Sequence, residues 1–292
     1  MGCGYTGLRL ARRLLPHWRV RATAHSDASA ARLPAEGLEV LRLDLDAPIA
    51  PDAAGALTAA AEGTALAYLA PPPERGVDDP RLARFLDAIG GARPTVVMYM
   101  STTGVYGDTG GGTVTESSPV APGNDRARRR VAAEQAVAAW CATRGVRPVV
   151  LRVPGIYGPG RLPLERLARG EAVLRPEDAG PGNRIHVDDL VTACVAALER
   201  AVQGIFNVGD GDHASTTEYL QRTAVLAGLP SPPLVSLADA PAQIPPGMLA
   251  FLVESRRVDV RRMREELGVV PRYANLDDGI AASLAEMRQA PG

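Results

Sequence analysis

The first seven residues, MGCGYTG, constrain the fold more than any other stretch, because Gly2, Gly4 and Gly7 have the spacing G-x-G-x-x-G. In a strand–turn–helix unit, the first glycine permits a tight turn and the second lets backbone amides approach a pyrophosphate. The third glycine lets the helix pack against the strand, and an amphipathic helical pattern follows at once in residues 8–15. The motif therefore predicts a dinucleotide-binding turn, with a purely structural turn as the alternative. The predicted cofactor contacts here are Gly2, Gly4, Tyr5, Thr6 and Gly7.

The strand that normally leads into such a turn has no counterpart in the sequence, because only Met1 precedes it. We expect the native start to lie several residues upstream, with an apolar strand for the centre of the sheet. A chain that begins at Met1 would leave that central position empty. We then expect weaker cofactor binding and a lower melting temperature than in a chain that carries the upstream residues.

Short apolar runs alternate with helical patterns along the chain, which is typical of βαβ units and a parallel sheet. The sequence predicts an α/β fold, namely a doubly wound Rossmann-type parallel sheet with a small C-terminal substrate lobe. The expected strands are 18–24, 38–44, 64–70, 95–101, 146–153 and 204–210, and the expected helices include 128–145, 258–268 and 276–288. Residues 229–247 are rich in proline and predict an irregular connection. The expected division is 1–153 plus about 184–211 for the cofactor-binding domain, and about 154–183 plus 212–292 for the substrate lobe.

Composition excludes several classes of function. A formal net charge of -1 provides no bulk attraction to nucleic acid or to an anionic membrane, and no apolar run is long enough to span a bilayer. Three scattered cysteines, without a C-x-x-C pair, favour a reducing, cytoplasmic location over a disulfide framework or a zinc site. All 32 basic residues are arginine, so no mechanism that needs a lysine amine is available.

The segment after the second expected strand indicates which dinucleotide binds. An acidic residue there favours NAD through the ribose 2′-hydroxyl, whereas basic or small polar residues favour NADP. The chain offers His25 and Ser26 as donors to a 2′-phosphate, with Arg12 nearby on the first helix. Asp27 follows too late and is expected to cap the next helix. NADP is therefore favoured over NAD.

Four further stretches carry a family resemblance. They are STTGVYGD (101–108), LRVPGIYGPGR (151–161), RIHVDDL (184–190) and FNVGDG (206–211). With the glycine loop, their order and spacing resemble the extended short-chain dehydrogenases/reductases, specifically the NAD(P)-dependent epimerases/dehydratases. The tail RRVDVRRMREELG (256–268) resembles an atypical subgroup in which the active-site residues are often replaced.

The resemblance implies roles for matching positions. Thr102 corresponds to the active-site Ser or Thr, whose hydroxyl bonds a substrate carbonyl or alcohol oxygen. Tyr157 is expected to line the mouth of the substrate pocket. HVDDL is expected to anchor the second lobe, with Asp188 or Asp189 capping the next helix as the favoured alternative. A zinc site formed by His186 with these aspartates is not favoured. The cofactor contacts implied along the rest of the chain are Asp44, Ala70, Pro154, Gly155 and Ile156.

The resemblance fails at the catalytic pair. Relatives carry Tyr-x-x-x-Lys followed by a glutamate, and alignment on Glu134 puts Arg126 and Arg130 at those two positions. A tyrosine acts as an acid/base when a neighbouring ammonium lowers its pKa, but arginine stays protonated throughout. Arg126 and Arg130 are four residues apart and share a helical face. They predict an anion-binding pair, with a solvated arginine face as the alternative.

Two classes of function follow. The first is an NAD(P)-dependent oxidoreductase or epimerase/dehydratase-like enzyme that acts on a small carbonyl or hydroxyl substrate, anionic if the arginine pair binds it. The second is a catalytically inactive NADP-binding sensor or regulator; a scaffold that binds no cofactor is a third, weaker possibility. The enzyme would take its proton from Tyr106, Tyr157, water or the substrate. The chain is expected to be a monomer, or a homodimer joined through the 125–144 helix.

Overall fold

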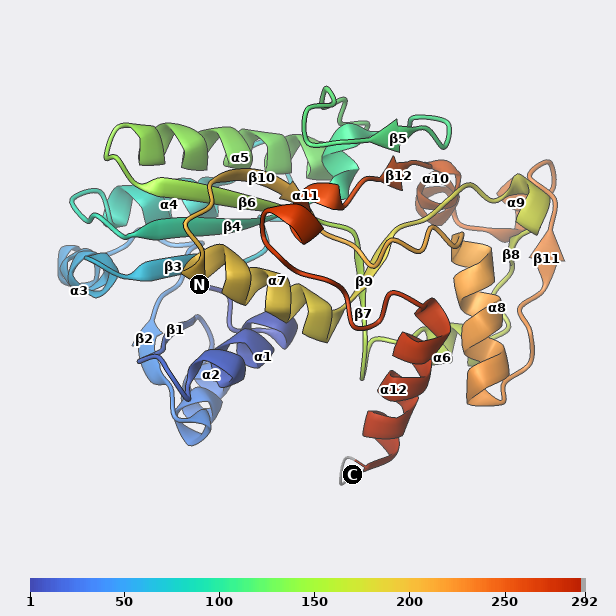
Figure 1. Ribbon diagram of the computed structural model, residues 1–292, viewed down its shortest axis with the longest axis horizontal. Helices are drawn as coiled ribbons and strands as arrows, with labels where there is room; N and C mark the ends of the chain where they lie inside the picture. The colour runs from blue at the N-terminus through green and yellow to red at the C-terminus, as the bar shows by residue number, and fades with distance from the viewer. Residues whose placement is uncertain (290–292) are drawn as a thin grey trace.

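The central sheet of the computed structural model, which describes residues 1–289, consists of four parallel strands in the order β10-β6-β4-β3. These strands are β3 (Ala65–Tyr68), β4 (Val96–Thr102), β6 (Arg147–Val153) and β10 (Gly204–Asn207). β4 and β6 form the middle of the sheet and are almost continuously buried, as strands covered on both faces must be. β1 (Arg21–Ala24) and β2 (Glu39–Arg42) pair with each other in a separate parallel sheet (Figure 1).

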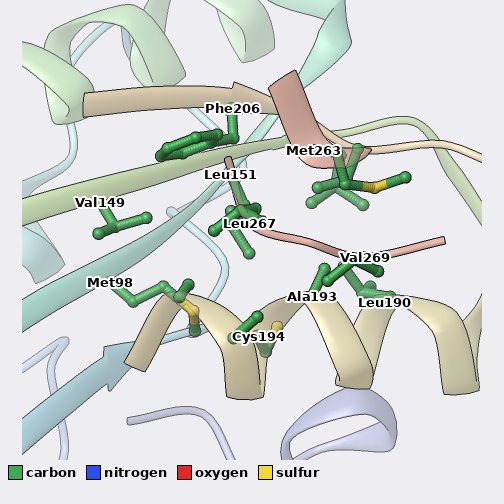
Figure 2. Close-up of a cluster of buried hydrophobic side chains, with 14 of the residues drawn as sticks. Met98, Val149, Leu151, Leu190, Ala193, Cys194, Phe206, Met263, Leu267 and Val269 are labelled. Carbon is green, nitrogen blue, oxygen red and sulfur yellow. The ribbon is translucent and has the colours of Figure 1, made fainter. Parts of the chain in front are cut away.

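Helices cover both faces of the central sheet (Figure 1). On one face lie α3 (Pro51–Ala61), α4 (Pro80–Ala88) and α5 (Asp125–Ala142), and on the other lie α1 (Tyr5–Leu14) and α7 (Val187–Glu199). Figure 2 shows the second face, where Met98, Leu151 and Phe206 of the strands meet Leu190 and Cys194 of α7. α11 (Arg261–Glu265) adds Met263 to the same cluster. The predicted α/β fold with a doubly wound parallel sheet is confirmed.

β1 and β3 are not paired with each other within residues 1–289, because β1 belongs to the two-stranded sheet with β2 and β3 is at the edge of the central sheet. The Met1 amine donates to the Ala67 carbonyl (2.8 Å), and the Leu69 amide donates to the Met1 carbonyl (2.9 Å). This is the pairing pattern of a parallel ladder, so Met1 continues the sheet beside β3. Next to it, a cavity of about 230 Å³ is lined by side chains of both strands and of α3 and α4.

The remaining segments form short elements beside the sheet. They are α2 (Asp27–Arg32), η1 (Leu33–Glu36), η2 (Thr103–Tyr106), β5 (Thr113–Val114), β7 (Gly155–Tyr157), α6 (Leu164–Ala168), β8 (Val173–Leu174), η3 (Pro176–Asp178), β9 (Arg184–His186), α8 (Thr216–Ala227), β11 (Leu234–Val235), α9 (Ala240–Gln243), α10 (Pro246–Val253), β12 (Arg257–Val258) and α12 (Leu276–Gln289). Three parallel pairs connect distant parts of the chain, namely β7 with β9, β8 with β11, and β5 with β12.

Two expectations need correction. Residues 229–247 are not wholly irregular, because β11 and α9 lie within them and α10 begins at their end. The helix expected over 258–268 is shorter, since Arg257 and Val258 pair with β5 and leave only α11.

The HVDDL segment ties the C-terminal part of the chain to the sheet. The Asp189 carboxylate accepts hydrogen bonds from the backbone amides of Arg272 (2.8 Å) and Tyr273 (3.0 Å). The helix cap expected from Asp188 or Asp189 comes instead from His186, whose Nδ1 accepts from the Asp188 amide (3.2 Å). Within residues 1–289, no helix is long and apolar enough to cross a membrane.

Candidate functional site

The glycine loop forms a cradle at the start of α1. A Cβ on Gly2, whose φ is +80°, would lie 2.5 Å from the Ala70 nitrogen, and one on Gly7 would lie 2.3 Å from the Gly2 carbonyl oxygen. A Cβ on Gly4 would meet nothing within 4 Å. Gly2 and Gly7 are thus required by close packing, whereas Gly4 faces open space at a helix N-terminus, where unpartnered amides hold an anion.

This cradle opens into a cleft of about 630 Å³ across the carboxyl ends of the strands. Ligands of open α/β sheets bind at this edge. The predicted contacts that line the cleft are Gly2, Gly4, Tyr5, Thr6, Gly7, His25, Asp44, Ala70 and Ile156. The residues present therefore fit a dinucleotide, with space for its pyrophosphate above Gly4.

The far end of the cleft differs in part from the prediction. Ser26, and not Asp27 as expected, caps α2 by accepting from the Ser29 amide (3.3 Å), and Ser26 does not line the cleft. Arg12 is bound to the Glu36 carboxylate through Nε (2.7 Å). Beside His25, the polar groups that line this end are Ser29 and Arg32, three residues apart on α2. The helical spacing that follows the Ser26 cap is the signal that could have identified them.

Arg130 and Tyr5 border the cleft at its other end. Nη1 of Arg130 donates to the Tyr99 hydroxyl (3.0 Å) and to the Met100 carbonyl (2.9 Å), which fixes the guanidinium against β4. The Tyr5 hydroxyl donates to the Pro159 carbonyl (2.9 Å), and the Arg161 guanidinium lies 4.2 Å from the centre of the Tyr5 ring. The glycine loop is thereby joined to the loop that follows β7.

A second cavity, of about 250 Å³, lies beyond the end of β4. Thr102 lines it, and its Oγ1 accepts a hydrogen bond from the Gly104 amide (3.2 Å). Pro154 and Gly155, predicted as cofactor contacts, line this cavity, whereas the next residue, Ile156, lines the cofactor cleft. The loop around β7 therefore forms the boundary between the two spaces.

The two arginines at the Tyr and Lys positions are not brought together. Arg126 lines the second cavity with Thr102, while Arg130 lines the cofactor cleft. The arginines that do accompany Arg126 are Arg184 and Arg256, which sequence reasoning missed. They come from β9 and from the segment after α10, which the local sequence gives no reason to associate with α5.

Neither candidate tyrosine lines the cofactor cleft or the second cavity. The Tyr106 hydroxyl donates to Asn207 Oδ1 (2.7 Å) in the core, and burial raises the Tyr106 pKa. Tyr157 is 2% exposed, and a Cβ on Gly279 would lie 2.1 Å from its hydroxyl oxygen. Burial also raises the pKa of Tyr157. Neither hydroxyl is therefore placed to exchange a proton with a substrate.

A buried ionic network lies beneath α5. The Glu134 carboxylate accepts from Arg152 Nη2 (2.7 Å) and Nε (3.1 Å), and the Ser101 hydroxyl also donates to it. The side chains of Glu134 and Arg152 are 8% and 4% exposed. Because Ser101 directly precedes Thr102, this network fixes the end of β4 and the helix that carries both Arg126 and Arg130.

Residues 2–209 match the NAD dependent epimerase/dehydratase family. A functionally unknown conserved protein from Silicibacter pomeroyi is 34% identical, with a TM-score of 0.81 over 98% of this chain and 96% of that one. A 3-diazoavenalumate denitrifying reductase from a Streptomyces species is 31% identical over 145 residues, 48% of each chain.

The fold is also that of solved sugar-nucleotide enzymes. UDP-glucuronic acid 4-epimerase from Bacillus cereus, in complex with NAD, is 18% identical, with a TM-score of 0.75 over 98% of this chain and 96% of that one. The chain spans about half the length of the curated relatives it matches. At such identity the likeness to the epimerase is one of fold.

Proposed function

The chain belongs to the NAD-dependent epimerase/dehydratase family, and we propose that it is an oxidoreductase that transfers a hydride between NADP(H) and a small carbonyl or hydroxyl compound. The proposal rests on one juxtaposition. Met100 and Ile156 line the cofactor cleft, and Thr102 and Gly155, on the same two strands, line the second cavity. A substrate in that cavity lies at the nicotinamide end of the cleft.

Different residues of the cleft would hold different parts of the cofactor. The glycine loop and the α1 N-terminus suit the pyrophosphate, and Asp44 suits the adenine end. Arg130 retains donors for ribose hydroxyls, because both of its side-chain hydrogen bonds within residues 1–289 use Nη1. When bound, the nicotinamide supplies or accepts the hydride.

Thr102 is the side chain proposed to contact the reacting oxygen. Its Oγ1 lone pair is used by the Gly104 amide, so the hydroxyl hydrogen is free to point into the cavity. A donor aimed at a carbonyl oxygen stabilises the negative charge that develops there as the hydride arrives. Since Tyr106 and Tyr157 are buried, water in the cavity is the proposed proton source.

Replacing Thr102 with valine tests this assignment. We expect kcat for NADPH oxidation by aldehydes such as 4-carboxybenzaldehyde to fall about 100-fold, the usual cost of one such donor. The Kd for NADP⁺ should stay within about twofold, and Thr102→Ser should restore most of kcat. If valine leaves kcat unchanged, Thr102 does not hold the reacting oxygen. NADPH binding without turnover of any carbonyl compound would favour the sensor instead.

Preference for NADP over NAD depends on the α2 end of the cleft. Arg32, with His25 and Ser29, forms a basic and polar set suited to a 2′-phosphate, while Asp27 is turned outward and paired with Arg42. Replacing Arg32 with alanine is expected to weaken NADP⁺ binding about 10-fold to 100-fold, as loss of a charge-assisted hydrogen bond does. NAD⁺ affinity should stay unchanged in the same calorimetric titrations. An equal loss for both would contradict the assignment.

A further inference from the structure

From the cavity beside Thr102 we infer the substrate class, namely a small carbonyl compound that carries one carboxylate or phosphate monoester and no nucleotide. That the ligand is a carbonyl compound rests on the proposed function. That it carries a negative charge is argued from the cavity alone. Three arginines, Arg126, Arg184 and Arg256, line the cavity, and within residues 1–289 Glu254 is the one acidic residue in its lining. The excess positive charge faces the space that the substrate would fill.

Pairing within the cavity leaves that excess uncompensated. Glu254 forms an ion pair with Arg256, whose Nε also donates to the Gly107 carbonyl (2.7 Å). Arg126 and Arg184 form no ion pair with any carboxylate in residues 1–289. Arg126 is exposed on the first turn of α5, where its guanidinium can reach an anion without disturbing the core.

Arg184 is the stronger indicator because it is buried. Its side chain stacks on Tyr219 (4.3 Å), and within residues 1–289 it donates only to neutral acceptors, namely the Ala214 carbonyl (2.6 Å) and Thr216 Oγ1 (3.2 Å). The residue is 8% exposed. A buried charge without an opposite partner is costly, so its retention at a cavity wall indicates that an anion completes it.

Two acids near Arg184, Asp210 and Asp212, do not supply that anion. Asp212 is paired with Arg222 (3.3 Å), and neither carboxyl group forms an ion pair with Arg184 within residues 1–289. Asp210 donates its backbone amide to the Arg184 carbonyl (2.9 Å). Burial raises the pKa of Asp210 to about 8, so the carboxyl group is mostly protonated at neutral pH. The positive charge of Arg184 is therefore left for a ligand.

The volume of the cavity limits what else the ligand can carry. At about 250 Å³ it is well under half the size of the cofactor cleft, at about 630 Å³, and below the roughly 300–1,000 Å³ of pockets for larger ligands. The wall after α10 is fixed, because the Ser255 amide donates to Asp108 Oδ1 (3.0 Å) and a Cβ on Gly180 would lie 2.3 Å from Ser255 Cβ. A nucleoside diphosphate sugar, comparable in size to a dinucleotide, does not fit.

Titration with unreactive probes tests the inference without turnover. Benzoate, phenyl phosphate, benzyl alcohol and UDP-glucose are titrated separately into the protein saturated with NADP⁺, by calorimetry. We expect benzoate or phenyl phosphate to bind at least about tenfold more tightly than benzyl alcohol, as a charge-assisted contact implies. UDP-glucose is expected not to bind. The stronger of the two anions identifies the group that the substrate carries.

Two variants on α5 distinguish a built site from general attraction of anions. Arg126→Ala is expected to weaken the preferred anion about 10-fold to 100-fold, whereas Arg128→Ala, which removes an exposed arginine paired with Asp125, should change its Kd less than twofold. Equal effects of the two variants, equal binding of benzyl alcohol, or binding of UDP-glucose would each overturn the inference. Anion binding as expected without NADPH oxidation would support it while rejecting the oxidoreductase.

Discussion

Replacing Glu134 with alanine is expected to lower the free energy of unfolding by about 3–5 kcal/mol, because the change leaves the Arg152 guanidinium buried without its counterion. Arg152 is 3% exposed, and its Nη1 already lacks a hydrogen-bond partner within residues 1–289. For a chain of this size, the loss corresponds to a fall in melting temperature on the order of 10 °C. Thermal and urea denaturation, followed by circular dichroism, measure both quantities.

Matched variants separate the buried network from ordinary ion pairs. Glu266→Ala removes the carboxylate of the exposed Arg262–Glu266 pair, which joins adjacent turns at 2.5 Å, and should cost less than about 1 kcal/mol. The double variant Glu134→Ala/Arg152→Met should be more stable than Glu134→Ala, since it removes the stranded charge. A Glu134→Ala protein as stable as Glu266→Ala would contradict the argument.

Features that depend on local sequence were predicted well. The glycine spacing specified the turn at Gly2, Gly4 and Gly7 because close backbone approach permits no other residue at the first and third positions. The apolar runs specified β4 and β6 because a central parallel strand is covered on both faces.

Which cavity or core each side chain faces was harder to predict. Successive residues of a strand point to opposite faces, so once Ile156 faces the cofactor cleft, Tyr157 is directed into the core. Arg126 and Arg130 do share a helical face, but one turn separates them by about 6 Å along the axis. Because α5 passes the boundary between the two cavities, this distance is enough to place Arg126 at the second cavity and Arg130 at the cofactor cleft. The partners of Arg126 come from segments more than 50 residues away, whose approach only the tertiary fold determines.

The second large effect is expected from Asp210→Asn and depends on pH. Asp210 is 2% exposed; its Oδ1 accepts the Asp212 amide (3.0 Å), and its Oδ2 has no partner within residues 1–289. Burial raises its pKa from 3.8 to about 8, so above about pH 4 the folded chain retains a proton that the unfolded chain releases. Stability therefore falls as pH rises through this window and levels off above about pH 8. Asparagine cannot ionise, so the variant does not lose stability through this group as pH rises.

Urea denaturation of both proteins at about pH 5 and about pH 8 measures the difference. We compare the free energy of unfolding of Asp210→Asn with that of the wild-type chain at each pH. We expect this difference to be more favourable to the variant at about pH 8 than at about pH 5 by roughly 4 kcal/mol, since each pKa unit is worth about 1.4 kcal/mol. A gain that does not vary with pH, or an Asp210 carboxyl that titrates near pH 4 by ¹³C NMR, would contradict the assignment.

The same variant also tests the charge of the substrate cavity. If Asp210 is already neutral at pH 7, its replacement adds no positive charge near Arg184, and the Kd for phenyl phosphate should change less than about twofold. A much tighter Kd in the variant would instead mean that an ionised Asp210 offsets the charge of Arg184 in the wild-type protein.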